Sequence, residues 1–210
     1  MKNENIDYKE VAKQLRKPNG EFGKIVAGKM NEGNKILTDL TYNSVNKFEG
    51  KYVLEIGFGN GYFLPKLIIN NCEKIYGIDY SELMVEEASI ILKSFIENKT
   101  IELKLASSDS IPYQDNYFDK ICTINTIYFW DEPINIIKEI KRVLKSGGIF
   151  SIGFRSKERI KILEFTKYGF SLYSIADVVK LFEDFNFQLI ESLVEDEIIY
   201  DAVCLTFRNI

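Results

Sequence analysis

The glycines at alternate positions Gly57, Gly59 and Gly61 have the clearest chemical meaning in this sequence. They follow a short apolar stretch, 53–56, that reads as a strand, and an apolar helix is expected over 62–69. Because glycine has no Cβ, such a backbone turns tightly and lets a ligand approach closely. Nucleotide-like ligands bind where parallel strands of an α/β sheet give way to helices. The alternative is a glycine turn in a loop with no ligand.

Acidic residues stand at the ends of three successive predicted strands. Glu55 precedes the glycines and can reach an ammonium group or orient the loop. Asp79 ends the second strand, where a carboxylate can accept hydrogen bonds from both ribose hydroxyls. Asp109, after Ser108, follows the third strand and can accept from an adenine amino group. Each acid alone is more typical of a helix cap or a solvated charge, but the three together favour a nucleoside ligand.

The elements that would position these residues alternate along the chain. Strands are predicted at 51–56, 74–79, 100–106, 118–124 and 148–154. Helices are predicted at 62–69, 81–97 and 133–145, with Ser81 as an N-cap and Pro133 in a first turn. This alternation indicates βαβ units, and therefore a parallel sheet with helices on both faces.

The C-terminal part departs from that alternation. After a helix at about 174–185, strands are predicted at 187–195 and 199–207 with only a short acidic link. Since so short a link cannot make a parallel crossover, the two strands must pair as an antiparallel hairpin. The sequence thus predicts an α/β fold with a doubly wound, mainly parallel seven-stranded sheet and an antiparallel C-terminal strand.

Over residues 50–210 the chain resembles the class I S-adenosylmethionine-dependent methyltransferases, specifically the small-molecule group related to the quinone-biosynthesis enzymes. The resemblance rests on motifs in the family's order, which are VLEIGFGNG (53–61), YGIDYS (76–81), ASSDSIPY (106–113), FDKICTINTIYFW (118–130) and EIKRVLKSGGIFSIG (139–153). It implies a Rossmann-like methyltransferase fold and S-adenosylmethionine as the cofactor. In that family the three glycines wrap the methionine part of the cofactor, and Glu55 would support their loop.

The resemblance also assigns contacts to the rest of the cofactor. It implies that Asp79 binds the ribose and that Asn125 lies near the methionyl group. The contacts that it implies for adenine are Tyr80, Met84, Ser108 and Asp109. It identifies no catalytic residue; if a general base is needed, Asp131, Glu132 or a tyrosine would have to serve.

The methyl acceptor is expected beside the loop after the fourth strand. In the family this loop lines the transfer pocket, so Tyr128 and Trp130 are predicted substrate contacts, able to wall an apolar or aromatic ligand. The alternative is that these rings pack the next helix against the sheet. Family members place a variable lid near the N-terminus, where Phe22, Met30 and Asn31 are candidate contacts. A packed cap without function is the alternative there.

Two regions follow from this organisation. Residues 1–50 are expected to form an N-terminal helical cap or lid, with helices at 5–17 and 34–47 around a glycine-punctuated segment. Residues 51–210 are expected to form the cofactor-binding domain. A second lid is expected as an insertion at 156–172.

Composition narrows the function further. The chain has no histidine, which excludes histidine bases and histidine metal ligands, and Cys72, Cys122 and Cys204 form no metal-binding pattern. No metal is therefore expected, and the unpaired cysteines fit a cytoplasmic protein. The net charge of −4 argues against nucleic acid as a partner, and no apolar stretch is long enough to span a membrane. The sequence does not predict the oligomeric state.

The leading hypothesis is a methyltransferase that moves a methyl group by in-line displacement to a small, apolar or aromatic metabolite. One alternative is a protein that binds S-adenosylmethionine without transferring its methyl group, such as a sensor or partner subunit. Another is a nicotinamide-dependent oxidoreductase. The glycine spacing, Asp109 and the terminal hairpin count against that last alternative.

Overall fold

A seven-stranded sheet forms the centre of the computed structural model, which describes residues 6–69 and 72–210. Its strands are β1 (Tyr52–Ile56), β2 (Lys74–Asp79), β3 (Ile101–Leu105), β4 (Phe118–Ile124), β5 (Leu144–Phe154), β6 (Phe187–Asp196) and β7 (Asp201–Asn209). The strand order is β3-β2-β1-β4-β5-β7-β6. Strands β1 to β5 pair in parallel, and β7 runs antiparallel to both β5 and β6. The predicted fold class is confirmed, including the C-terminal hairpin.

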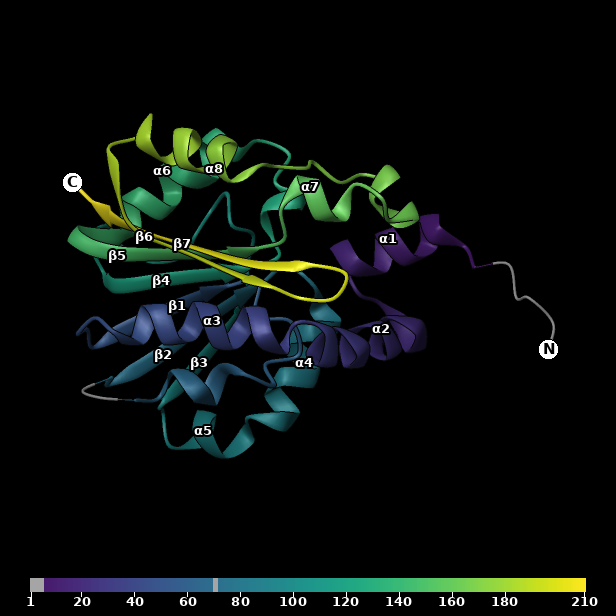
Figure 1. The fold of residues 1–210 in the computed structure, drawn as a ribbon. Coiled ribbons are helices and arrows are strands. Elements are labelled where there is room, and N and C mark those ends of the chain that lie inside the picture. The colour runs from purple at the N-terminus through teal and green to yellow at the C-terminus, as the bar shows by residue number, and fades with distance from the viewer. Residues whose placement is uncertain (1–5, 70–71) are drawn as a thin grey trace.

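Helices cover both faces of this sheet (Figure 1). The α-helices are α1 (Tyr8–Arg16), α2 (Gly20–Gly33), α3 (Lys35–Asn46), α4 (Glu82–Ile91), α5 (Lys93–Glu97), α6 (Pro133–Val143), α7 (Lys157–Ile160) and α8 (Ile175–Glu183). Short 3₁₀ helices are η1 (Leu64–Leu67), η2 (Ile127–Phe129) and η3 (Glu164–Lys167). Helices α6 and α8 lie on one face and α3, α4 and α5 on the other, while α1 and α2 lie beyond one end of the sheet. No helix of the described ranges is long and apolar enough to cross a membrane.

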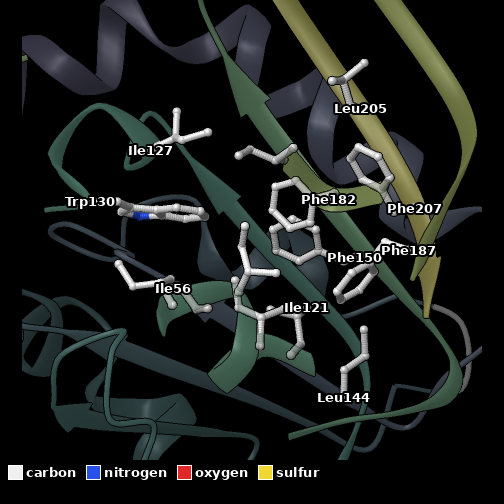
Figure 2. Close-up of a cluster of buried hydrophobic side chains, with 14 of the residues drawn as sticks. Ile56, Ile121, Ile127, Trp130, Leu144, Phe150, Phe182, Phe187, Leu205 and Phe207 are labelled. Atoms are coloured by element: carbon white, nitrogen blue, oxygen red, sulfur yellow. The ribbon is translucent and has the colours of Figure 1, made fainter. Parts of the chain in front are cut away.

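The core on the α6 and α8 face is built on stacked phenylalanines. The ring of Phe182 on α8 lies 4.8 Å from that of Phe150 on β5 and 4.9 Å from that of Phe207 on β7. Figure 2 shows these rings between the strands, with Trp130 at the far side of the cluster from Phe187. Buried aromatic rings contribute a large apolar area to a core, so the stacking of Phe182 on Phe150 and Phe207 helps to hold α8 on the sheet.

Two predicted helix positions need correction. The helix expected over 62–69 is only the 3₁₀ turn η1, in which Pro65 stands in the first turn and Leu64 and Leu67 are buried. The helix expected over 81–97 divides into α4 and α5 at the buried Leu92. Ser81 caps α4 by accepting a hydrogen bond from the backbone N–H of Met84, as predicted.

The sequence pattern predicts no helix for the glycine-punctuated segment before residue 34, and the structure has the 14-residue helix α2 there. Its buried Val26 and Ala27 pack inward, and tertiary packing of this kind outweighs the low helix propensity of glycine. Helix α1 begins at Tyr8 with Asp7 as its N-cap, and residue 5 of the predicted helix lies outside the described residues.

Helix α3 approaches β5 closely at a glycine. A Cβ built at Gly153 would stand 2.2 Å from Oγ1 of Thr41 and 3.3 Å from Cδ1 of Leu37, and both residues are buried. The hydroxyl of Thr41 cannot turn aside freely because it donates to the backbone carbonyl of Leu37. The absence of a side chain at Gly153 therefore sets how near α3 lies to the sheet.

We predict that Gly153→Ala lowers the free energy of unfolding by about 1–3 kcal/mol, because the added methyl group overpacks this contact. Gly28→Ala is the control, since nothing lies within 4 Å of a Cβ at that helical position. It should raise stability by about 0.5–1 kcal/mol. Chemical denaturation followed by circular dichroism measures both. Equal stability of Gly153→Ala and the unmodified chain would contradict the close contact.

Candidate functional site

A cavity of about 380 Å³ opens at the carboxyl ends of the parallel strands. Its floor comes from the loops after β1, β2, β3 and β4, and its roof from residues of α1, α2 and α3. This is the edge of an open α/β sheet where ligands bind, and the volume falls in the range of small-molecule sites.

The glycine loop after β1 is a left-handed turn. Gly57, Gly59 and Gly61 have φ angles of 75°, 60° and 73°, a region that favours glycine. A Cβ at Gly57 would stand 2.4 Å from Cγ2 of Thr126, and one at Gly61 would stand 2.8 Å from Cβ of Ala88. The first two glycines line the cavity, whereas Gly61 lets the loop pack against α4.

Asp79, at the end of β2, ties the glycine loop to the next helix. One carboxylate oxygen accepts the backbone N–H of Gly59 and the other accepts that of Ser81, each at 2.9 Å. Burial raises the pKa of this carboxyl to about 6, against the lowering effect of those hydrogen bonds. Its remaining lone pairs face the cavity and can accept hydroxyl hydrogen bonds.

Glu55 is buried beneath the same cavity. Its Oε2 accepts a hydrogen bond of 2.6 Å from the hydroxyl of Tyr42 on α3. Burial raises the pKa of Glu55 to about 8, and Tyr42 lowers it by less. Glu55 is therefore largely protonated at neutral pH in the ligand-free chain, and a cation placed beside it would favour its ionised form.

The loop after β4 forms the wall beside the glycine turn. Asn125 adopts a left-handed φ of 55°, and Thr126, Phe129 and Trp130 line the cavity with it. Trp130 is only 4% exposed, so part of its ring also packs in the core, 6.4 Å from the ring of Phe182. Both the substrate-wall and the packing interpretations of Trp130 thus find support in its position.

Helices α1 and α2 are fastened across the mouth of the cavity. The hydroxyls of Tyr80 and Ser81 donate to the backbone carbonyls of Arg16 and Pro18, between the two helices. On the other side, the guanidinium of Arg16 pairs with the carboxylate of Asp131. These contacts connect the helices to the ends of β2 and to the loop after β4.

Most of the residues singled out from the sequence line this one cavity. They are Glu55, Gly57, Gly59, Asp79, Tyr80, Met84, Ser108, Asp109, Asn125, Trp130, Met30 and Asn31. Residues from four strand ends and from α2 thus meet in one place, as expected for a nucleoside site with a neighbouring acceptor site.

The structure places three predicted site residues outside the lining. Gly61 faces α4, as described above. Tyr128 points into the interior, where its hydroxyl bonds to Asn125 and to the backbone of Arg155. Phe22 projects from α2 into solvent with 43% of its surface exposed. We therefore do not assign these three to direct ligand contact.

Other lining residues were not foreseen. Tyr42, Arg16 and Asn34 all come from the N-terminal helices, more than eight residues before β1. No spacing in the sequence relates them to the strand ends, because their position depends on how α1 to α3 pack. Among the described residues no group of histidine, cysteine, aspartate and glutamate is placed to bind a metal ion.

Comparison with known proteins identifies the class to which this site belongs. Residues 54–152 match the family model described as a methyltransferase domain. An uncharacterized methyltransferase, YdaC of Bacillus subtilis, is 31% identical over 157 residues, which cover 74% of this chain and 84% of that protein. The chain belongs to the class I S-adenosylmethionine-dependent methyltransferase family and is an enzyme of that family. The matches do not single out its quinone-biosynthesis group.

A solved structure agrees on the fold, and a further sequence match covers part of the chain. A SAM-dependent methyltransferase from Aquifex aeolicus superposes with a TM-score of 0.68 at 23% identity, over 98% of this chain and all of that one. A tRNA U34 carboxymethyltransferase of Nautilia profundicola is 36% identical over 100 residues, which are 48% of this chain. The match spans 33% of that protein, so the two have only a part in common.

The raised pKa of Glu55 predicts how stability depends on pH. Between its ordinary value of 4.5 and about 8, the folded chain holds a proton that the unfolded chain releases. The free energy of unfolding should therefore fall as pH rises through this window, by up to about 1.4 kcal/mol per pH unit from Glu55. Asp79 adds a fall between 3.8 and about 6.

Glu55→Gln keeps the shape of the side chain and removes its titration. Urea denaturation at several pH values from 6 to 8 should give a flatter pH dependence for this variant than for the unmodified chain. Glu97→Gln, at an exposed site on α5, should leave the dependence unchanged. Parallel pH curves for Glu55→Gln and the unmodified chain would refute a raised pKa at this position.

Proposed function

We propose that the chain transfers the methyl group of S-adenosylmethionine to a small apolar or aromatic molecule. The observation that most supports this is that one cavity of about 380 Å³ is lined both by carboxylates suited to a nucleoside and by aromatic side chains. Asp79 is one of these carboxylates, and Phe129 and Trp130 are two of the aromatic side chains. The family assignment favours this activity over cofactor binding alone.

The residues at the strand ends fit the cofactor. Gly57 and Gly59 line the cavity, and open space beside Gly59 suits the methionine part, with Glu55 among the lining residues to balance an ammonium charge. The lone pairs of Asp79 suit ribose hydroxyls. The proposed adenine site is formed by the remaining cofactor candidates, which are Tyr80, Met84, Ser108 and Asp109.

When bound, S-adenosylmethionine supplies a methyl group already activated by its sulfonium, so the chain's own task is to orient the acceptor in line with it. The aromatic wall excludes water and can stabilise a nearby cation through its ring faces. For an acceptor that must lose a proton, Asp131 and Glu132 are exposed carboxylates at the mouth of the cavity. Asp131 is held by Arg16, which leaves Glu132 the freer of the two.

The helices α1 and α2 are proposed to act as a lid, together with the segment 156–172. Met30 and Asn31 of α2 contact the cavity, and the packing of α1 against η3 joins the two proposed lid segments. Since the side-chain contacts from Tyr80, Ser81 and Asp131 to these helices are few, opening on the microsecond-to-millisecond scale is compatible with ligand exchange.

A small molecule suits the charge of the chain better than a nucleic acid does. The net charge is −4, and phosphate backbones are bound through clustered lysine and arginine. The tRNA-modifying relatives share only part of their length with this chain. Arg16 is the one basic side chain of the described residues that lines the cavity, and it is paired with Asp131.

Calorimetric titration with S-adenosylhomocysteine, the demethylated product, tests the cofactor site. We expect saturable binding, and we expect Asp79→Asn to weaken it at least about tenfold, because a hydrogen bond to a charged group contributes roughly 1.5–3 kcal/mol. Asp184→Asn, at the exposed end of α8, is the control and should bind normally. No heat of binding to the unmodified chain would remove the proposal.

Incubation with tritiated S-adenosylmethionine and a fractionated cell extract tests the acceptor. We expect label in a low-molecular-weight, organic-extractable fraction, because the acceptor wall is aromatic. Label that appears instead in an RNA fraction, and is lost after ribonuclease treatment, would show a tRNA-type substrate.

A further inference from the structure

A chain of hydrogen bonds runs from the interior to the cavity through two side-chain amides. The backbone N–H of Arg155 donates to the hydroxyl of Tyr128. The hydroxyl oxygen of Tyr128 lies 3.1 Å from Oδ1 of Asn125 and 3.1 Å from the carbonyl oxygen of Arg155, the two acceptors for its one hydrogen. Nδ2 of Asn125 then donates to Oδ1 of Asn34 at 2.9 Å.

The bond from Asn125 occupies the amide oxygen of Asn34 and so determines which atom of that amide is available to a ligand. A backbone N–H can only donate, so Tyr128 accepts there, and its own hydrogen has Asn125 and the carbonyl of Arg155 as acceptors. Asn125 receives it at oxygen and passes on an N–H, which occupies the oxygen of Asn34. Nδ2 of Asn34 is left with two N–H groups that bond to none of the residues the structure describes, and Asn34 lines the cavity.

Arg155 also supports the backbone next to Asn34, the second of the two bonded amides. Its guanidinium, in a side chain only 8% exposed, donates at 2.6 Å to the carbonyl of Gly33, the residue before Asn34. It is fixed in turn by Glu197 at 2.8 Å and by the carbonyl of Asp201 at 2.9 Å. One buried residue thus supports Asn125 through its backbone and Asn34 through its side chain.

We propose that Asn34 donates a hydrogen bond to an oxygen of the bound ligand, and that Arg155 and Tyr128 are positioning residues that aim it. An amide N–H binds a carboxylate, carbonyl or hydroxyl oxygen and rejects a protonated amine. Two sources share this chemistry, which are the carboxylate of the cofactor's methionyl end and an oxygen of the acceptor. The inference rests on the proposed function and deepens it.

Asn34→Asp separates the two sources. It keeps the oxygen that Asn125 needs and replaces the donor with a second oxygen. The probes are S-adenosylhomocysteine and 5′-methylthioadenosine, which has the adenosine and sulfur but no amino-acid end. If the carboxylate is the source, calorimetry will show at least about tenfold weaker binding of S-adenosylhomocysteine, with methylthioadenosine within twofold of the unmodified chain.

If an acceptor oxygen is the source, both probes will bind normally and tritium transfer at saturating S-adenosylmethionine will fall at least about tenfold. Asn135→Asp is the matched control, since it places the same charge on the exposed first turn of α6, outside the cavity lining. Unchanged binding and unchanged transfer in Asn34→Asp would overturn the proposal. Failure of the unmodified chain to bind either probe would instead refute the proposed function.

Tyr128→Phe tests the positioning. It removes the hydroxyl that connects Arg155 to Asn125, so we expect a loss of the same kind as in Asn34→Asp, about three- to tenfold. Tyr76→Phe is the control, because Tyr76 is equally buried at 4% exposure and, among the described residues, its hydroxyl bonds only to Tyr117, away from the cavity. If both variants lower the melting temperature and neither changes ligand affinity or transfer, Tyr128 is structural only and the positioning role is wrong.

Discussion

The hydrogen bonds from Gly59 and Ser81 to the carboxylate of Asp79 hold the floor of the site together. They join the turn after β1 to the start of α4, and they use a side chain that stands at the end of β2. The turn can take this path because its glycines adopt left-handed φ angles, and because Gly57 and Gly61 leave room for Thr126 and Ala88. The sheet therefore does more than support the cavity. It brings the carboxylate and the backbone donors to the same edge, so that each orients the other before any ligand binds.

The same edge also anchors the N-terminal helices. Tyr80 and Ser81, directly after Asp79, donate to the carbonyls at the α1–α2 connection, and Asn125 at the end of β4 meets Asn34 at the α2–α3 connection. Each connection between the roof helices is thus fastened to a different strand end. Helix α3 packs tightly on β5 through Gly153, so the roof is firm on that side and lightly attached at α1. This difference in how firmly α3 and α1 are attached suits a site in which one part of the roof must move and another must not.

Local patterns in the sequence were sufficient to predict the residues that form the floor of the site. They were insufficient to predict those that form its roof. Glycine spacing and the acids at strand ends depend on positions that a parallel sheet brings together whatever the rest of the chain does, so Gly57, Asp79 and Asp109 were predictable. Tyr42 and Asn34 reach the cavity only through the packing of helices on the sheet, and helix α2 itself forms despite its glycines because its apolar face is buried. Tyr128 shows the opposite case. Its residue type and its position after β4 suggested a ligand contact, but its hydroxyl points inward and accepts a hydrogen bond from the backbone N–H of Arg155.

Trp130 gives this architecture an internal optical reporter. It is the only tryptophan of the chain, and its ring lies between the phenylalanine cluster and the cavity. Indole emission depends on the polarity and the charges around the ring, so the intrinsic fluorescence of the whole protein reports on a single wall of a single cavity. Filling of the cavity, displacement of its water and movement of the roof above it would all be visible without any label, in a chain whose remaining aromatic residues emit at shorter wavelength.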